Sequence, residues 1–200
     1  MASQGRPESE AGDYGNMKAF PESVASTPPD LDSDAHLQFR METLYYKTRE
    51  RLDLVNITAD LNEIIKRHGF RAGFVIVQSL HTTTAVFINE FQQALVDDMK
   101  AFLEKLVGRH DYWRHNDPHL SECERHNAAS HLRAMVLGHT LSLPLRNGAL
   151  ALGGWQSVIL AELDGPRERA VQVQLFGVPA ASASPLLSSA GRPGDSASAR

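Results

Sequence analysis

The sequence predicts a compact α+β domain built largely from antiparallel β-sheet with two or three helices. Short runs of alternating or β-branched apolar residues recur along the chain, which is typical of strands. Apolar residues spaced by three and four positions, typical of helices, occur in only a few segments. Asn147 and Gly148 lie between two apolar runs and predict a tight hairpin, because both turn residues must accept positive φ. Few helices embedded among many strands indicate the α+β class.

The elements follow from the same patterns. Strands are predicted at residues 36–44, 52–57, 72–78, 83–89, 140–145, 149–152, 155–163 and 168–178. The first helix is predicted to begin at Thr58 or Asp60 and to end at Gly69. The second covers 92–107, and a short third runs from Asn127 to Leu137. Residues 108–126 have little periodicity and predict a long loop, a kind of segment that is often functional.

The two ends of the chain differ in composition from its centre. Residues 1–35 and 180–200 are rich in Ser, Pro and Gly, and both are predicted to be disordered tails. Residues 36–179 then form one domain, which is long enough to bury a hydrophobic core.

Composition also narrows the function classes. The net charge is −4 with no basic block, which argues against nucleic acid as a partner. The sequence shows neither a signal peptide nor an apolar run of membrane-spanning length, so no membrane role is expected. The single cysteine, Cys123, cannot form an internal disulfide, which favours the cytoplasm.

Histidine is the most unevenly distributed residue type. Six of the nine histidines lie between positions 110 and 139, and imidazole is both the commonest side-chain metal ligand and the group that titrates near neutral pH. Neither a paired CxxC nor an HExxH motif is present, which leaves an open three-ligand site as the metal hypothesis. Four of the six are interpreted as surface or packing residues: His110, His119, His126 and His139.

Local patterns suggest individual site residues, each with a structural alternative. His81 lies where a strand meets a pocket or is only satisfied by local hydrogen bonds. His115 near Asp117 is a ligand held by a carboxylate or part of a polar loop. Asn127 and His131 share one helix face, although Asn127 can be only a cap.

The predicted strand at 155–163 carries two further polar residues. Alternation places Gln156 and Glu162 on the same face, with Trp155 on the other. A glutamate in an apolar strand must be paired with a partner, bound to a ligand or placed at the rim of the site. The alternative is an edge strand whose glutamate reaches solvent.

Several short blocks occur in a fixed order along the chain. They are His81-Thr82-Thr83, Ile88-Asn89-Glu90, His115-Asn116-Asp117, Asn127 with Ser130-His131-Leu132, Asn147-Gly148, Trp155-Gln156, and Glu162 with Asp164-Gly165-Pro166-Arg167. In this order the blocks resemble the YjbQ-like family, often labelled secondary thiamine-phosphate synthase. The resemblance covers about residues 36–178.

The resemblance implies a compact α+β fold, a homotrimer and a pocket lined by histidines. His81, His115 and His131 are the expected metal ligands, and three neutral imidazoles can hold a divalent ion, Mg or Zn, with one position open. The expected catalytic residues are His81, Glu90, His115, Asp117, Asn127 and His131. The expected substrate-binding residues are Gln156, Glu162 and Arg167. Gly154 replaces a threonine that is common in the family, which affects details of substrate binding rather than the fold.

Three functions fit these observations. The first is a transferase that couples a pyrimidine methyl diphosphate to a thiazole phosphate, with Arg133 or Arg167 adding positive charge around the leaving diphosphate. The second is a metal-dependent hydrolase or lyase of a small molecule, and the third is a non-catalytic trimer that binds a metal or ligand. Glu90 and Asp117 favour an enzyme, because a binding protein does not need acids beside its histidines.

Overall fold

The computed structural model describes residues 36–122 and 124–179. The predicted tails at 1–35 and 180–200, and also Cys123, lie outside the described residues. Within the described ranges, no helix is long and apolar enough to cross a membrane.

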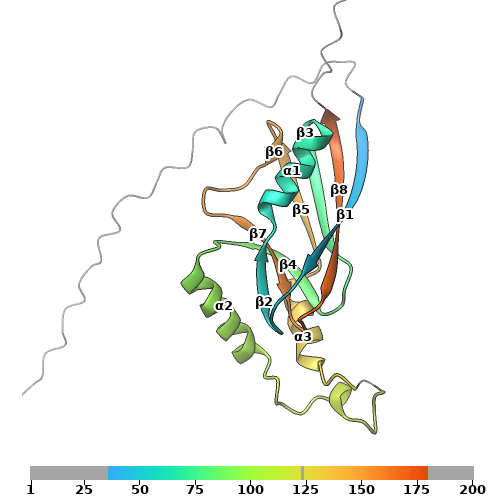
Figure 1. The fold of residues 1–200 in the computed structure, drawn as a ribbon, viewed down its shortest axis with the longest axis vertical. Helices are drawn as coiled ribbons and strands as arrows, with labels where there is room; N and C mark the ends of the chain where they lie inside the picture. Colours follow the sequence, from blue (N-terminus) through green and yellow to red (C-terminus); the bar gives the residue numbers. More distant parts are fainter. Residues whose placement is uncertain (1–35, 123, 180–200) are drawn as a thin grey trace, which may run out of the picture.

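Two antiparallel sheets form the frame of the molecule (Figure 1). The five-stranded sheet has the order β1-β8-β3-β5-β6, with β1 at Gln38–Lys47, β8 at Glu168–Pro179, β3 at Phe70–Ser79, β5 at Thr140–Arg146 and β6 at Ala149–Leu150. The three-stranded sheet has the order β2-β7-β4, with β2 at Asp53–Asn56, β7 at Ser157–Glu162 and β4 at Thr84–Asn89. The helices are α1 at Thr58–His68, α2 at Gln93–Leu106 and α3 at Ala128–Leu137, and a 3-10 turn covers Arg114–Asn116. The predicted α+β class is therefore confirmed.

The central strand β7 separates two hydrophobic clusters. Val158 and Leu160 point toward α1 and the five-stranded sheet, where the larger cluster lies. Ile159 and Ala161 point the other way and share a second cluster with residues of α2 and α3. This alternation confirms the strand parity predicted for residues 157–162 and explains why β7 is buried on both faces.

The end of α1 and the β5–β6 turn lie at the glycine and Asn-Gly positions predicted from the sequence. Gly69 ends α1 with a φ of 68°, and Asn147 and Gly148 have φ values of 51° and 78° in the β5–β6 hairpin. Gln156 differs from the prediction, because β7 begins only at Ser157, whereas His81 precedes β4, which begins at Thr84, as the predicted strand at 83–89 implies. Both side chains therefore project from loops rather than from strands.

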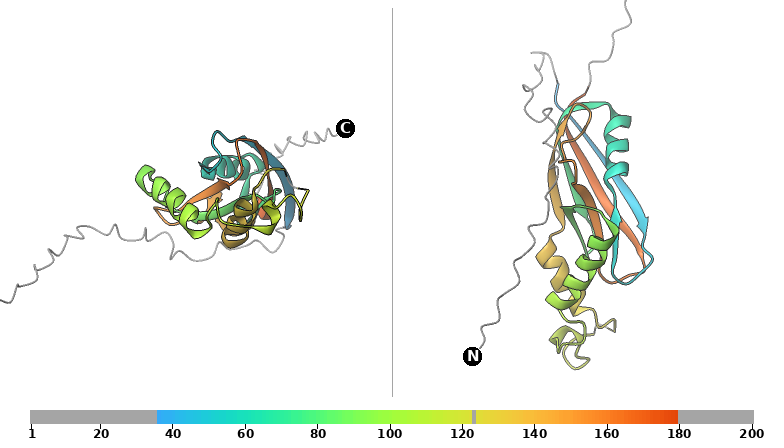
Figure 2. Two further views of the ribbon diagram at one scale, coloured as in Figure 1. Left: turned by 90° about the horizontal axis from the view of Figure 1, so that it is seen from below. Right: turned by 90° about the vertical axis from the view of Figure 1, so that its left-hand side faces the viewer.

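The strand register defines two ends of the three-stranded sheet. Thr84 pairs with Glu162 at the end that we call the histidine end, and Asn89 pairs with Ser157 at the opposite end. Because β4 has six residues, these ends are about 20 Å apart. Figures 1 and 2 show α3 and the loop between α2 and α3 at one end of the molecule, and the β5–β6 hairpin at the other.

Candidate functional site

The predicted site residues divide between the two ends of the three-stranded sheet. Glu90 and Gln156 adjoin the opposite end, next to Asn89 and Ser157. All the other predicted residues lie at the histidine end or in the loop beside it: His81, His115, Asp117, Asn127, His131, Glu162 and Arg167. The chain therefore does not bring the nine residues into one site by itself.

At the histidine end, the rings of His115 and His131 meet. Their centroids are 5.2 Å apart and their planes are at 89°, an edge-to-face contact. His115 lies in the 3-10 turn and is exposed, whereas His131 lies on the first turns of α3 and is half-buried. Asn116 joins these segments, because its Oδ1 accepts the backbone N–H of Ala128 at 3.0 Å. The pair is therefore fixed by a cap that the loop supplies to α3.

The environment of His131 favours its neutral form. Burial lowers its pKa below the ordinary value, and the neighbouring His115 lowers the pKa further, while Asp164 acts in the opposite direction. A neutral imidazole near pH 7 can accept a proton, and its conjugate acid gives one up readily. The pair is thus suited to proton transfer.

His81 is held at the end of a sheet ladder. Its Nε2 accepts the N–H of Ala170 at 2.8 Å, in the place of a strand carbonyl. Burial lowers the pKa of His81, with Arg169 acting in the same direction and Glu162 against it. Because Nε2 accepts this hydrogen bond, the neutral ring carries its own proton on Nδ1. His81 therefore has the geometry of the predicted alternative, in which a hydrogen bond to a neighbouring group in the fold occupies its ring nitrogen.

Two fully buried carboxylates lie at the end of β7: Glu162 is its last residue, and Asp164 follows two residues later. Glu162 accepts Nε and Nη2 of Arg169 at 2.5 and 2.6 Å and the Thr48 hydroxyl at 3.1 Å. One of its oxygens also accepts the backbone N–H of Asp164 at 2.8 Å. The same guanidinium donates to the Thr83 hydroxyl at 3.1 Å, which fastens the turn that follows His81. Glu162 therefore has partners within the protein on both oxygens, and its predicted substrate contact stays a prediction.

Asp164 is surrounded by three side-chain donors from two segments. Its Oδ2 accepts Nε of Arg125 and Nδ2 of Asn127, each at 2.9 Å. Its Oδ1 lies 3.2 Å from Nη2 of Arg51 in an ion pair whose alignment is too poor for a hydrogen bond. Asn127 thus acts through Asp164 rather than as a side-chain cap of α3.

Neither arginine that binds Asp164 was among the predicted site residues. The sequence named Arg133 and Arg167 as sources of positive charge. Arg133 is instead buried and donates to the carbonyl of Val107 at 3.2 and 2.7 Å, at the end of α2. The sequence offers one indication for Arg125: it lies near the end of the predicted long loop, shortly before His131.

The loop before α3 holds Asp117 by local contacts. Its carboxylate accepts the hydroxyl of Tyr112 at 3.0 Å and the backbone N–H of His119 at 2.9 Å. The hydroxyl of Ser121 lies 3.4 Å from Nδ1 of His115. These contacts shape the turn that presents His115, while the catalytic role of Asp117 stays a prediction.

The opposite end is simpler. The side-chain Oε1 of Gln156 accepts the backbone N–H of Gly153 at 2.8 Å, and the side-chain Oδ1 of Asn89 accepts the backbone N–H of Glu90 at 2.9 Å. Gln156 is exposed and Glu90 half-buried. The bonds of these two predicted residues are local and shape loops, whereas a long-range side-chain bond at this end joins Asn56 Nδ2 to the Ser157 hydroxyl at 3.2 Å.

The three predicted metal ligands do not form a metal centre within one chain. Across residues 36–122 and 124–179, no group of three or more His, Cys, Asp or Glu side chains is placed to hold a metal ion. A metal on His81 would also require its ring to leave the Ala170 N–H. The metal therefore stays a prediction, tested by metal analysis of the purified protein before and after His81→Ala and His131→Ala.

Comparison with known proteins agrees with this α+β architecture. The sequence profile of the family described as UPF0047 protein YjbQ-like matches residues 42–178. The chain therefore belongs to the YjbQ-like family, which confirms the resemblance inferred from the motifs.

Relatives cover the described domain almost end to end. A UPF0047 protein of Methanothermobacter thermautotrophicus is 38% identical over 138 residues, which are 69% of this chain and 92% of the relative. The UPF0047 protein YugU of Bacillus subtilis is 29% identical over 139 residues, 68% of this chain and 99% of that protein.

Solved structures show the same fold. A crystal structure described as a YbjQ-like protein of unknown function from Sulfolobus solfataricus has a TM-score of 0.66 at 31% identity, and the match covers 71% of this chain and 99% of that one. A hypothetical protein from Aeropyrum pernix has a TM-score of 0.62 at 32% identity, covering 68% and 97%.

Proposed function

We propose that this protein is a transferase of the thiamine-phosphate synthase type with a secondary activity, and that its chemistry takes place at the histidine end. The observation that carries the proposal is the contact between His115 and His131, with ring centroids 5.2 Å apart at the surface of the domain. Two imidazoles fixed this way, one with a lowered pKa, support proton transfer near neutral pH.

The coupling reaction makes one bond and breaks one. The thiazole nitrogen attacks the methylene carbon of the pyrimidine, a C–N bond forms, and the C–O bond to the diphosphate breaks with its electron pair on oxygen. The leaving diphosphate needs a proton or positive charge. The proposal assigns the proton to the imidazole pair: His131 takes up a proton from solvent, and its protonated form, which is the stronger acid because the pKa is lowered, passes the proton to the departing diphosphate oxygen.

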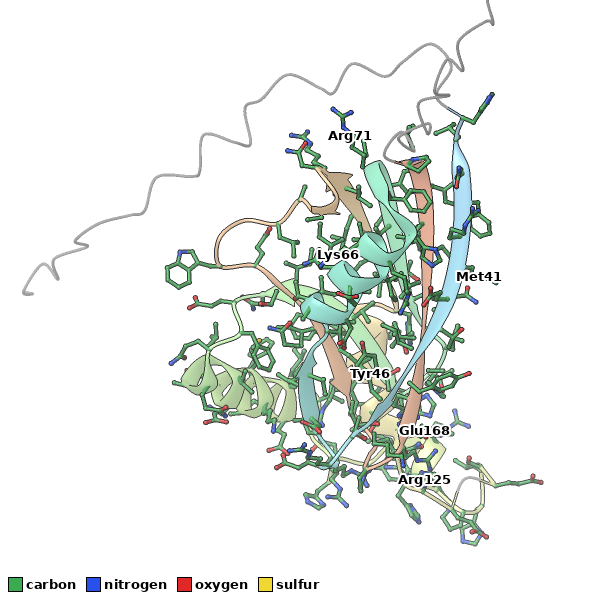
Figure 3. All side chains as sticks on the ribbon, turned by 45° about the horizontal axis from the view of Figure 1, so that its top comes forward. Met41, Tyr46, Lys66, Arg71, Arg125 and Glu168 are labelled. Carbon is green, nitrogen blue, oxygen red and sulfur yellow. The ribbon has the colours of Figure 1, made fainter. Side chains whose placement is uncertain are left out.

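A direct assay tests this function. Purified protein is incubated with the pyrimidine methyl diphosphate and the thiazole phosphate, and thiamine phosphate is measured. We expect product with the wild type and a loss of about 10²-fold or more with His131→Gln, since general acid catalysis contributes factors of this size. Arg71→Gln is the matched control, because Arg71 is exposed on β3 at the other end of the molecule (Figure 3). No product with the wild type at high protein concentration contradicts the proposal.

A genetic test is independent of purified substrates. Expression of the wild type should rescue a thiamine-requiring bacterial strain, and His115→Ala should remove the rescue. Rescue that persists in His115→Ala at equal protein level contradicts the role given to the histidine pair.

The proposal includes a homotrimer in the cytoplasm. The homotrimer is what the resemblance of the sequence blocks to the YjbQ-like family implies. The single cysteine of the sequence fits a reducing compartment. Light scattering on the purified full chain tests the assembly, and a monomeric mass contradicts it.

A further inference from the structure

We propose that Arg51 and Arg125 form a subsite for the phosphate or diphosphate group of a small ligand, beside the His115–His131 pair. This inference rests on the proposed function for the identity of the ligand, but the binding of the anion itself does not depend on any reaction.

The buried polar cluster at the histidine end has more positive than negative groups. Glu162 and Asp164 supply two carboxylates, while Arg51, Arg125 and Arg169 supply three guanidinium groups. Both carboxylates are fully buried. Arg51 and Arg125 contact Asp164, and Arg169 contacts Glu162. The cluster therefore carries one excess positive charge, which a bound anion would neutralise.

The three arginines differ in exposure. The side chain of Arg169 is 3% exposed and is turned toward Glu162 and Thr83 inside the domain. Those of Arg51 and Arg125 are 32% and 46% exposed, although each is fixed by Asp164. The excess charge thus reaches solvent through these two side chains (Figure 3 shows Arg125 at the lower end).

Asp164 holds Arg125 through two hydrogen bonds and Arg51 through an ion pair, and neither guanidinium uses all its donors. Its side chain and carbonyl contact Nε and Nη2 of Arg125, and its Oδ1 contacts Nη2 of Arg51. A guanidinium has five N–H donors in a rigid fork that matches phosphate oxygens. Held in advance, the two groups lose little side-chain entropy when an anion binds.

The position of the pair connects it to the chemistry. Asp164 lies close enough to His131 to affect its pKa, and it binds Asn127 directly before α3. The positive end of the α3 dipole also faces this region and favours an anion. A phosphate held by the arginines would then lie next to the His115–His131 pair.

Binding of pyrophosphate tests the subsite without any turnover. Full-length protein is titrated with pyrophosphate at low and constant ionic strength, and the dissociation constant is measured by calorimetry. We expect wild-type binding, a dissociation constant about tenfold higher in Arg125→Gln, since a charge-assisted hydrogen bond is worth about this factor, and no change in Arg71→Gln. Arg51→Gln should also weaken binding, and it decides the question if Arg125→Gln is shown by circular dichroism to be unfolded.

Two results would overturn the subsite. One is wild-type protein that does not bind pyrophosphate, and the other is unchanged affinity in folded variants of both arginines. Failure of the coupling assay with pyrophosphate binding intact and lost in the arginine variants overturns the transferase but supports the subsite. Coupling that proceeds normally in folded Arg125→Gln and Arg51→Gln keeps the transferase and shows that its diphosphate does not use the subsite.

Discussion

The two ends of the three-stranded sheet hold polar residues in different ways. At the histidine end, Glu162 and Asp164 are buried and held by Thr48 just after β1, by Arg169 of β8 and by the loops around residues 51 and 125. At the opposite end, Gln156 and Glu90 bond only to neighbours within three residues in the contacts described above. Long-range contacts fix side chains before a ligand arrives, whereas local caps mainly shape a loop. The histidine end is therefore the preorganised one.

The largest effect is expected where a buried charge loses its partner. Arg169→Met leaves Glu162 fully buried without its guanidinium, and we expect unfolding to become easier by about 3–5 kcal/mol. Urea denaturation measures this difference, with Arg71→Met at an exposed position as control, expected within about 0.5 kcal/mol. A loss below about 1 kcal/mol for Arg169→Met would mean that the ion pair does not organise this end.

The next effect concerns the cap between the loop and α3. Asn116→Ala removes the acceptor for the Ala128 N–H and should cost about 0.5–2 kcal/mol. The same change should separate the rings of His115 and His131, seen as loss of the nuclear Overhauser contact between them. Asn116→Asp keeps an acceptor and should keep the contact. Equal loss in both variants would show that the cap does not position the pair.

A smaller effect is expected in the pH dependence of stability. The pKa of His81 is below its ordinary value of 6.5 in the folded state, so the unfolded chain binds the proton more readily. The stability from the Ala170 hydrogen bond is present above pH about 6.5 and is lost as the pH falls through the folded pKa. His131 has a lowered pKa too and acts in the same direction. His81→Gln should therefore reduce the slope of stability against pH without removing it, and an unchanged slope in thermal melts between pH 7 and 5 contradicts this account.

The smallest effect is expected at the opposite end. Gln156→Ala removes one exposed hydrogen bond to Gly153, and we expect a change of about 0.5 kcal/mol or less in unfolding free energy. Affinity for pyrophosphate should be the same as in the wild type. Loss of pyrophosphate binding in this variant would place the anion site at the opposite end and contradict the proposed subsite at the histidine end.

Local sequence patterns predicted the fold well because they act over a few residues. Alternation gave the two faces of β7, and Asn147-Gly148 gave the β5–β6 turn. The same patterns could not show that Arg125 meets Asp164, since 39 residues separate them and no short motif joins them. The resemblance grouped His81 and Glu90 as catalytic residues from their order along the chain, and this order does not show that the length of β4 separates them.

The central claim is that ligands bind at the histidine end. The most direct measurement is a two-dimensional NMR titration of the full chain with pyrophosphate, following assigned backbone and imidazole signals. The account predicts shifts at His115, His131 and Arg125, with the signals of Gly153 and Gln156 unchanged. Shifts that gather at Gly153 and Gln156 while the histidine signals stay fixed would contradict it.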